Sequence, residues 1–141
     1  ALRKGALDVE ADRFFRNALL AAPSIPEFNT AYASFLLERG EVEAALEQYA
    51  IAHELHPMET EALNGLGYIS LQRGELTLSE NYLNDCIALD PDHILARINR
   101  VLLHLQAGNK DLMEMDLRFL KDRHSEDPRV QRLLDYLKEL I

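Results

Sequence analysis

The sequence predicts an all-α protein built from consecutive helical hairpins that stack side by side. Two sets of helix-breaking residues carry this prediction, because each set recurs every 34 residues along the chain. The prolines of the set are Pro23, Pro57 and Pro91, and the glycines are Gly40, Gly74 and Gly108. A period of this length is typical of a repeated unit of two helices. With 141 residues, the chain is long enough for several such units around a continuous core.

Each unit is expected to contain a first helix, a turn at the glycine, a second helix and a stop before the proline. A glycine just past a helix end adopts the left-handed conformation without a steric penalty. Proline lacks an amide hydrogen and restricts the residue before it, so each proline marks a helix end. The predicted divisions are 1–24 for the second helix of an incomplete repeat, 25–58 and 59–92 for two complete repeats, 93–125 for a degenerate terminal repeat, and 126–141 for a capping helix.

The second helix of each unit carries small and bulky residues in phase. Within each helix the spacing is four residues and then three, which places all three on one face. The sets are Ala11, Phe15 and Ala18, then Ala45, Tyr49 and Ala52, then Ser79, Leu83 and Cys86. Small residues allow helices to approach closely, and the bulky residue fills the remaining space. The single cysteine, Cys86, is therefore predicted to pack in the core rather than to react.

This pattern resembles the tetratricopeptide repeat, in which small residues flank an aromatic residue in the second helix and a proline closes the unit. Leu66-Gly67 is similar to the Leu-Gly pair of that repeat's first helix. Ala33 and Val101 occupy the same place as Gly67. The resemblance extends from about residue 7 to residue 124. It implies that the hairpins form a right-handed superhelix with the first helices lining its concave side.

The two ends of the chain depart from the repeat. At the start only a second helix is recognisable, at roughly residues 5–22, which predicts that the chain begins inside a longer array. In the last repeat Ser125 replaces the closing proline, so the array is expected to end there. Asp127-Pro128 then matches an N-cap followed by proline at the first helical position. The helix that follows has one apolar face suited to covering the last hairpin, formed by Val130, Leu133, Leu134, Leu137 and Ile141.

The concave surface implied by the resemblance is the expected partner-binding site. Its side chains are those of the first helices that do not face the neighbouring repeat. They change from polar to apolar along the chain: Thr30, Ser34 and Leu37, then Asn64, Tyr68 and Leu71, then Leu95, Ile98, Asn99, Leu102 and Leu105. The four aliphatic residues of the last group exceed what packing requires, so either a partner or the capping helix covers them. The two asparagines are candidates for binding the main chain of an extended peptide.

A second apolar stripe, Leu112, Met115 and Phe119, lies on the second helix of the last repeat. We expect the last helix to cover it, because an exposed stripe of this kind would favour self-association.

Charge and composition exclude several other functions. The net charge is −9, and between residues 38 and 96 twelve acidic residues face two basic ones. Such a surface repels the phosphates of nucleic acids and favours a partner with a basic flank. No apolar run approaches the length of about 20 residues that a membrane span needs. The histidines lack converging metal ligands, and the chain has no glycine-rich phosphate loop, so we expect no metal, cofactor or catalytic site.

These observations predict a non-enzymatic scaffold or adaptor that binds a peptide segment of another protein in the concave groove. One alternative is a chaperone or assembly factor of a bacterial secretion or pilus system, which a short, capped array resembles in size. Another is a regulatory or docking domain of a larger enzyme. Self-association through the unpaired face of the first helix is also open. A single cysteine fits a reducing compartment such as the cytoplasm.

Overall fold

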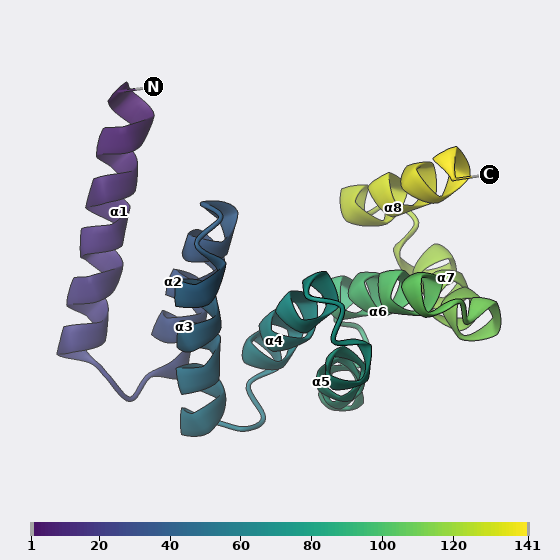
Figure 1. The fold of residues 1–141 in the computed structure, drawn as a ribbon, viewed down its shortest axis with the longest axis horizontal. Coiled ribbons are helices and arrows are strands. Elements are labelled where there is room, and N and C mark those ends of the chain that lie inside the picture. The colour runs from purple at the N-terminus through teal and green to yellow at the C-terminus, as the bar shows by residue number, and fades with distance from the viewer. Residues whose placement is uncertain (1, 141) are drawn as a thin grey trace. The chain divides into compact units, whose positions relative to one another are not determined.

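The computed structural model describes residues 2–140, and within them the only regular elements are helices (Figure 1). Over this range the helices are α1 (Leu2–Ala21), α2 (Pro26–Glu38), α3 (Val42–Leu55), α4 (Thr60–Gln72), α5 (Leu76–Leu89), α6 (Ile94–Ala107), α7 (Lys110–His124) and α8 (Pro128–Glu139). The contacts divide the chain into two compact units, one ending at Leu66 and the other beginning at Gly67. The boundary therefore lies within α4, and the units are described one at a time.

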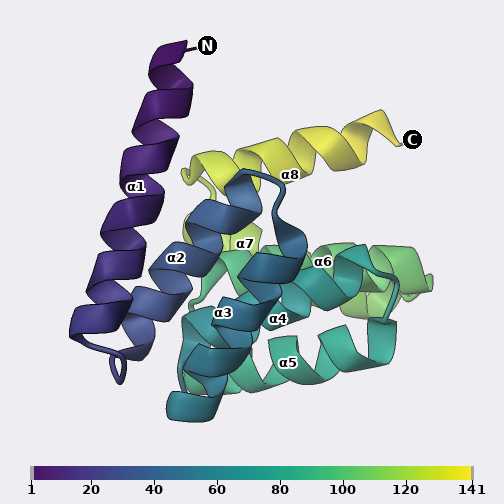
Figure 2. The same ribbon diagram turned by 60° about the vertical axis from the view of Figure 1, so that its left-hand side comes forward.

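In the first unit, α2 and α3 form a hairpin and lie side by side (Figure 2). Gly40 makes the turn between them with a φ of 80°. Its amide donates a hydrogen bond to the carbonyl of Leu37, at 3.0 Å, and the amide of Glu41 donates to Leu36, at 2.9 Å. These bonds satisfy carbonyls at the helix end. The predicted left-handed glycine turns are confirmed, because Gly74 and Gly108 each have a φ of 77°.

An aromatic cluster holds α1 against α2. The ring of Phe15 stacks on that of Tyr32 with a centroid separation of 5.4 Å, and it lies 5.3 Å from the ring of Phe35. The hydroxyl of Tyr32 donates a hydrogen bond of 2.5 Å to Oδ1 of Asp12. Large aromatic side chains of this kind dominate packing energetics in small cores. The α1 helix begins at Leu2, a few residues earlier than the sequence predicts.

In the second unit, close helix packing depends on the predicted small residues. The hydroxyl of Ser79 in α5 donates a 2.7 Å hydrogen bond to the carbonyl of Gly67 in α4. The side chain of Leu83 lies where a Cβ atom at residue 67 would be, so a larger residue would displace it. Cys86 is fully buried, as its small-residue position predicts. The backbones therefore approach closely because Gly67 has no side chain.

The last helix, α8, covers the α6–α7 hairpin, as predicted. Asp127 caps it by accepting a hydrogen bond of 2.8 Å from the amide of Arg129, and Pro128 occupies its first turn. Val130 and Leu133 of α8 are buried in one cluster with residues of the hairpin, Val101 and Leu120. Around this cluster pack the partly buried residues Ile94, Ile98, Leu102, Met113, Leu117, Leu134 and Leu137. Ile141, which the sequence places on the same face, lies outside the described residues.

Candidate functional site

An apolar pocket of about 400 Å³ lies between α6 and α8 in the second unit. Its lining consists of Leu95, Ile98, Leu102, Arg129, Arg132, Leu133 and Tyr136. Leu95 and Tyr136 retain 38% and 48% of their exposure, so solvent reaches the pocket from the side where they lie. Ile98 and Leu102 are half-buried and pack against the core cluster. The pocket thus combines a wall fixed by packing with apolar side chains open to solvent.

Two arginines give this pocket a positive side, although the chain as a whole is acidic. Arg129 is held by Asp127 through two hydrogen bonds, from Nε at 3.0 Å and from Nη2 at 2.8 Å. The side chain and the backbone amide of Arg129 lower the pKa of Asp127 to about 2, so this pair is ionised at neutral pH. Arg132 is exposed at the pocket. A cation beside apolar walls suits an anionic group adjacent to an apolar one.

The structure brings three of the predicted α6 residues together in this pocket and separates the other two from it. Leu95, Ile98 and Leu102 line the pocket, but α8 supplies the opposite wall. The alternative that the capping helix packs against these residues therefore holds for part of the group. Leu105 lies at the far end of α6 in a different apolar pocket of about 550 Å³, formed with residues of α7 and α8. Asn99 is buried.

The remaining predicted residues are mostly less accessible than the sequence suggests. Thr30, Asn64 and Leu71 are buried. The Thr30 hydroxyl donates a hydrogen bond to the carbonyl of Glu27 in its own helix, at 3.1 Å. Ser34 is exposed, and Leu37 and Tyr68 are half-buried. Helical spacing identifies the face of a residue, but burial also depends on neighbouring helices, which a spacing argument does not contain.

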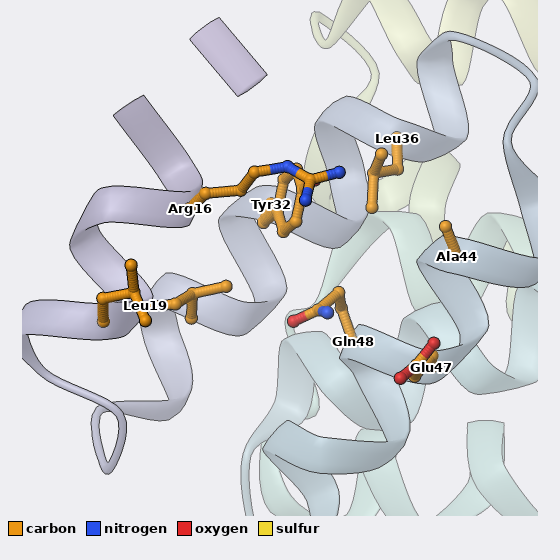
Figure 3. A pocket seen from close by; sticks show the side chains of 8 residues that line it. Arg16, Leu19, Tyr32, Leu36, Ala44, Glu47 and Gln48 are labelled. Carbon is orange, nitrogen blue, oxygen red and sulfur yellow. The ribbon is translucent and has the colours of Figure 1, made fainter. Parts of the chain in front are cut away.

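The first unit contains a pocket that the sequence did not predict (Figure 3). It has a volume of about 500 Å³, and its lining comes from α1, α2 and α3: Arg16, Leu19, Leu20, Tyr32, Leu36, Ala44, Glu47 and Gln48. The carboxylate of Asp12 fixes Arg16 across one helical turn at 2.6 Å. Hydrogen bonding from Tyr32 and Arg16 lowers the pKa of Asp12. The spacing of Asp12 and Arg16 was the only sequence signal for this site.

A charged cluster between α6 and α7 was also missed. Asp116 of α7 is buried and accepts hydrogen bonds from two arginines of α6. Arg100 reaches it at 2.7 Å and Arg97 at 3.0 Å. The Arg97 guanidinium also lies 3.7 Å from the centre of the Phe119 ring. Three charged groups here replace the apolar contacts between hairpin helices, and their mutual pairing points to a structural role.

Two sequence interpretations are wrong. The stripe on α7 was expected to lie under α8, but Leu112 and Met115 are exposed. Phe119 is instead covered by the guanidinium groups of Arg97 and Arg123. The histidines near helix ends were interpreted as surface residues, yet His93 is buried and caps α6 by accepting a hydrogen bond from the amide of Ala96.

Within residues 2–140, no group of three or more histidine, cysteine or acidic side chains is arranged to hold a metal ion. None of the described helices is both long enough and apolar enough to cross a membrane.

Comparison with solved structures identifies the fold. The chain superposes on TTC0263, a thermophilic TPR protein of Thermus thermophilus, with a TM-score of 0.80 and 23% identity over 96% of this chain and 75% of that one. It superposes on YrrB, described as a TPR protein with an unusual peptide-binding site, with a TM-score of 0.74 and 22% identity over 95% and 68%. A tetratricopeptide repeat protein from Parabacteroides merdae matches with a TM-score of 0.76 and 23% identity, and this chain spans about half of its length (93% and 51% covered).

No family model and no curated protein sequence matches the chain. The predicted fold class, helical hairpins of the tetratricopeptide type with a C-terminal helix, is confirmed by the structural likeness. The division into individual repeats stays a prediction.

Proposed function

We propose, on the premise that this chain has the tetratricopeptide repeat fold, that it is a non-enzymatic scaffold that binds a segment of another protein. The proposed site is the pocket between α6 and α8, and the observation that carries it is an exposed apolar surface on a wall that the core holds in place. A surface that is already ordered loses little conformational entropy when a partner binds. The peptide-binding site named for the structural neighbour YrrB supports a peptide as the occupant.

An apolar side chain of the partner would enter between Leu95 and Tyr136 and contact Ile98 and Leu102 at the base. Full burial of one such side chain is worth about 1.5–3 kcal/mol before ordering costs. Arg132 favours an acidic residue beside this anchor. A basic flank of the partner fits farther from the pocket, where acidic residues predominate along the chain between residues 38 and 96.

The other residues of the predicted groove belong to this proposal in a secondary role. Ser34, Leu37 and Tyr68 retain some exposure and are proposed to contact the flanks of a bound segment. Thr30, Asn64, Leu71 and Asn99 are buried and are proposed to shape the surface rather than to contact the partner. Leu105 would take part only if the segment extends to the second pocket at the end of α6.

Selection of peptides from a random displayed library tests the proposal. Peptides that bind the intact chain would be counter-selected on Leu95→Asp, with Leu78→Asp as the matched control. Leu78 lies on α5 and is exposed to a similar degree, 41% against 38% for Leu95. Leu102→Asp is a poorer choice, because Leu102 also packs against the core. We expect the selected peptides to bind the control and not Leu95→Asp. Peptides that bind both variants equally, or no selected peptide at all, would reject this site.

A further inference from the structure

One face of α1 carries apolar side chains that no described helix covers. We call it the Phe14 face, and it consists of Leu7, Ala11, Phe14, Ala18 and Ala21. Alternating spacings of four and three residues place these side chains on one stripe of the helix. Phe14 is 68% exposed and Leu7 is also exposed. The helix meets α2 through a different part of its surface, the part that carries Phe15.

The other hairpins show what this face contacts when a partner helix is present. Phe14, Gln48, Tyr82 and Asp116 are successive residues at a spacing of 34. Gln48 accepts a 3.0 Å hydrogen bond from Asn29, which lies on the first helix of its own hairpin. Tyr82 has its Cβ 3.4 Å from the Cβ position of Gly67, and Asp116 pairs with Arg97 and Arg100. In all three hairpins, this position faces the first helix of the same hairpin.

The Phe14 face is also continuous with an interface that already exists. The Phe14 ring meets the Phe15 ring edge to face at a centroid distance of 5.7 Å. Phe15 in turn stacks on Tyr32 of α2. Ala11 and Ala18 are half-buried along the same line, so the exposed stripe borders the α1–α2 core directly. A helix seated on the stripe would extend this packing rather than begin a separate contact.

The chain does not turn at the place where the hairpins turn. Ala6 is 34 residues before Gly40, yet it lies within α1, whereas Gly40 has a positive φ and ends a helix. A first helix linked through a glycine turn at that position is therefore not how this face is filled. A second copy of the chain is disfavoured as well, because each copy carries a net charge of −9.

We infer that the Phe14 face binds an amphipathic helix of another polypeptide, seated on α1 as α4 is seated on α5. The chemistry of that helix follows from the hairpins. Ala11 corresponds in register to Ser79, which contacts Gly67, so the bound helix carries glycine or alanine opposite Ala11. Leucine-sized residues beside it surround Phe14. The exposed Glu10 at the edge of the stripe and the net charge favour basic residues on its flanks.

The test uses a defined probe, a labelled synthetic peptide of residues 59–73, which contains α4. It would be held helical by a lactam between Glu61 and a Gly65→Lys substitution, because a free helix of this length is only marginally stable. Both positions lie on the side of α4 away from Gly67. Fluorescence anisotropy would follow its titration with the intact chain. We expect saturable binding that weakens roughly tenfold or more in Phe14→Asp, the loss that one buried aromatic side chain implies.

Leu20→Asp is the matched control, because Leu20 is an 82% exposed residue of α1 outside the Phe14 face. Phe14→Gln, which introduces the residue found at this position in the second hairpin, gives an independent variant if Phe14→Asp loses helicity by circular dichroism. A probe carrying Gly67→Leu should bind more weakly, because its backbone is kept away from Ala11. Absence of binding, or equal weakening by Leu20→Asp and Phe14→Asp, overturns the inference. Light scattering that shows a dimer dissociated by Phe14→Asp assigns the face to a second copy and also overturns it.

Discussion

The ring of Tyr49 occupies the space in which a Cβ atom at residue 65 would lie, so that Gly65 permits the contact between this ring and α4. Both residues are buried. Tyr49 belongs to the series of bulky residues between small ones that the sequence shows at a 34-residue spacing. The relationship therefore gives the repeated pattern a physical reason, namely that a large side chain requires a missing one opposite it.

Gly65→Ala is expected to destabilise the protein. Alanine raises intrinsic helix propensity by about 1 kcal/mol, but forcing a methyl group into a packed site costs about 1–3 kcal/mol. We expect a net loss of about 1 kcal/mol in the free energy of unfolding, measured by urea denaturation with circular dichroism. Gly5→Ala is the control, because nothing lies within 4 Å of a Cβ atom at residue 5. Equal stability of Gly65→Ala and the unchanged protein would contradict the account of this contact.

Asp116→Asn is expected to cost more, at about 2–3 kcal/mol. The substitution removes the negative charge that compensates Arg97 and Arg100, whose side chains are themselves largely buried. The same denaturation measurement applies, with Asp122→Asn as the control, because Asp122 is an exposed acid on the same helix. A cost below about 0.5 kcal/mol would mean that water compensates the two arginines as well as the carboxylate does.

Tyr49 also predicts a pH dependence at high pH. Burial, followed by the nearby carboxylates of Glu61 and Glu38, raises the pKa of Tyr49 to about 12 from a usual value near 10. Between these values the unfolded chain has lost the tyrosine proton and the folded chain has kept it. The stability that this group contributes is therefore present below about pH 10 and is lost towards pH 12, with a total of about 2 kcal/mol.

Urea denaturation at a series of pH values from 9 to 11.5 would measure this loss. Tyr49→Phe should show a shallower decline than the unchanged protein, and Tyr136→Phe, which alters an exposed tyrosine, should not. If Tyr49→Phe declined as steeply as the unchanged protein, another group would account for the pH dependence.

Local backbone requirements explain why much of the fold could be predicted. The left-handed glycines, the closing prolines and the Asp127-Pro128 cap each act within a few residues of themselves, so sequence spacing contains the necessary information. Small residues at fixed intervals likewise imply close helix packing wherever the helices meet. The same spacing placed Leu95, Ile98 and Leu102 on one face, and the structure brings them into one pocket.

The features that escaped prediction depend on contacts between distant residues. Asp116 pairs with arginines 16 and 19 residues earlier, and this pairing requires the relative rotation of two helices, which no local pattern fixes. The position of α8 likewise decides that Leu102 is partly covered and that Met115 stays exposed. Burial of Thr30 and Asn64 follows from neighbouring helices in the same way. Sequence spacing therefore defined faces, and tertiary packing decided which of their residues reach solvent.

The most direct test of the proposed function is the affinity of a library-selected peptide for three proteins, measured by isothermal titration calorimetry: the unchanged chain, Leu95→Asp and Leu78→Asp. Loss of one apolar contact in the pocket between α6 and α8 predicts a dissociation constant roughly tenfold or more higher for Leu95→Asp. The account predicts little change for Leu78→Asp. Equal affinity of the peptide for all three proteins would contradict it.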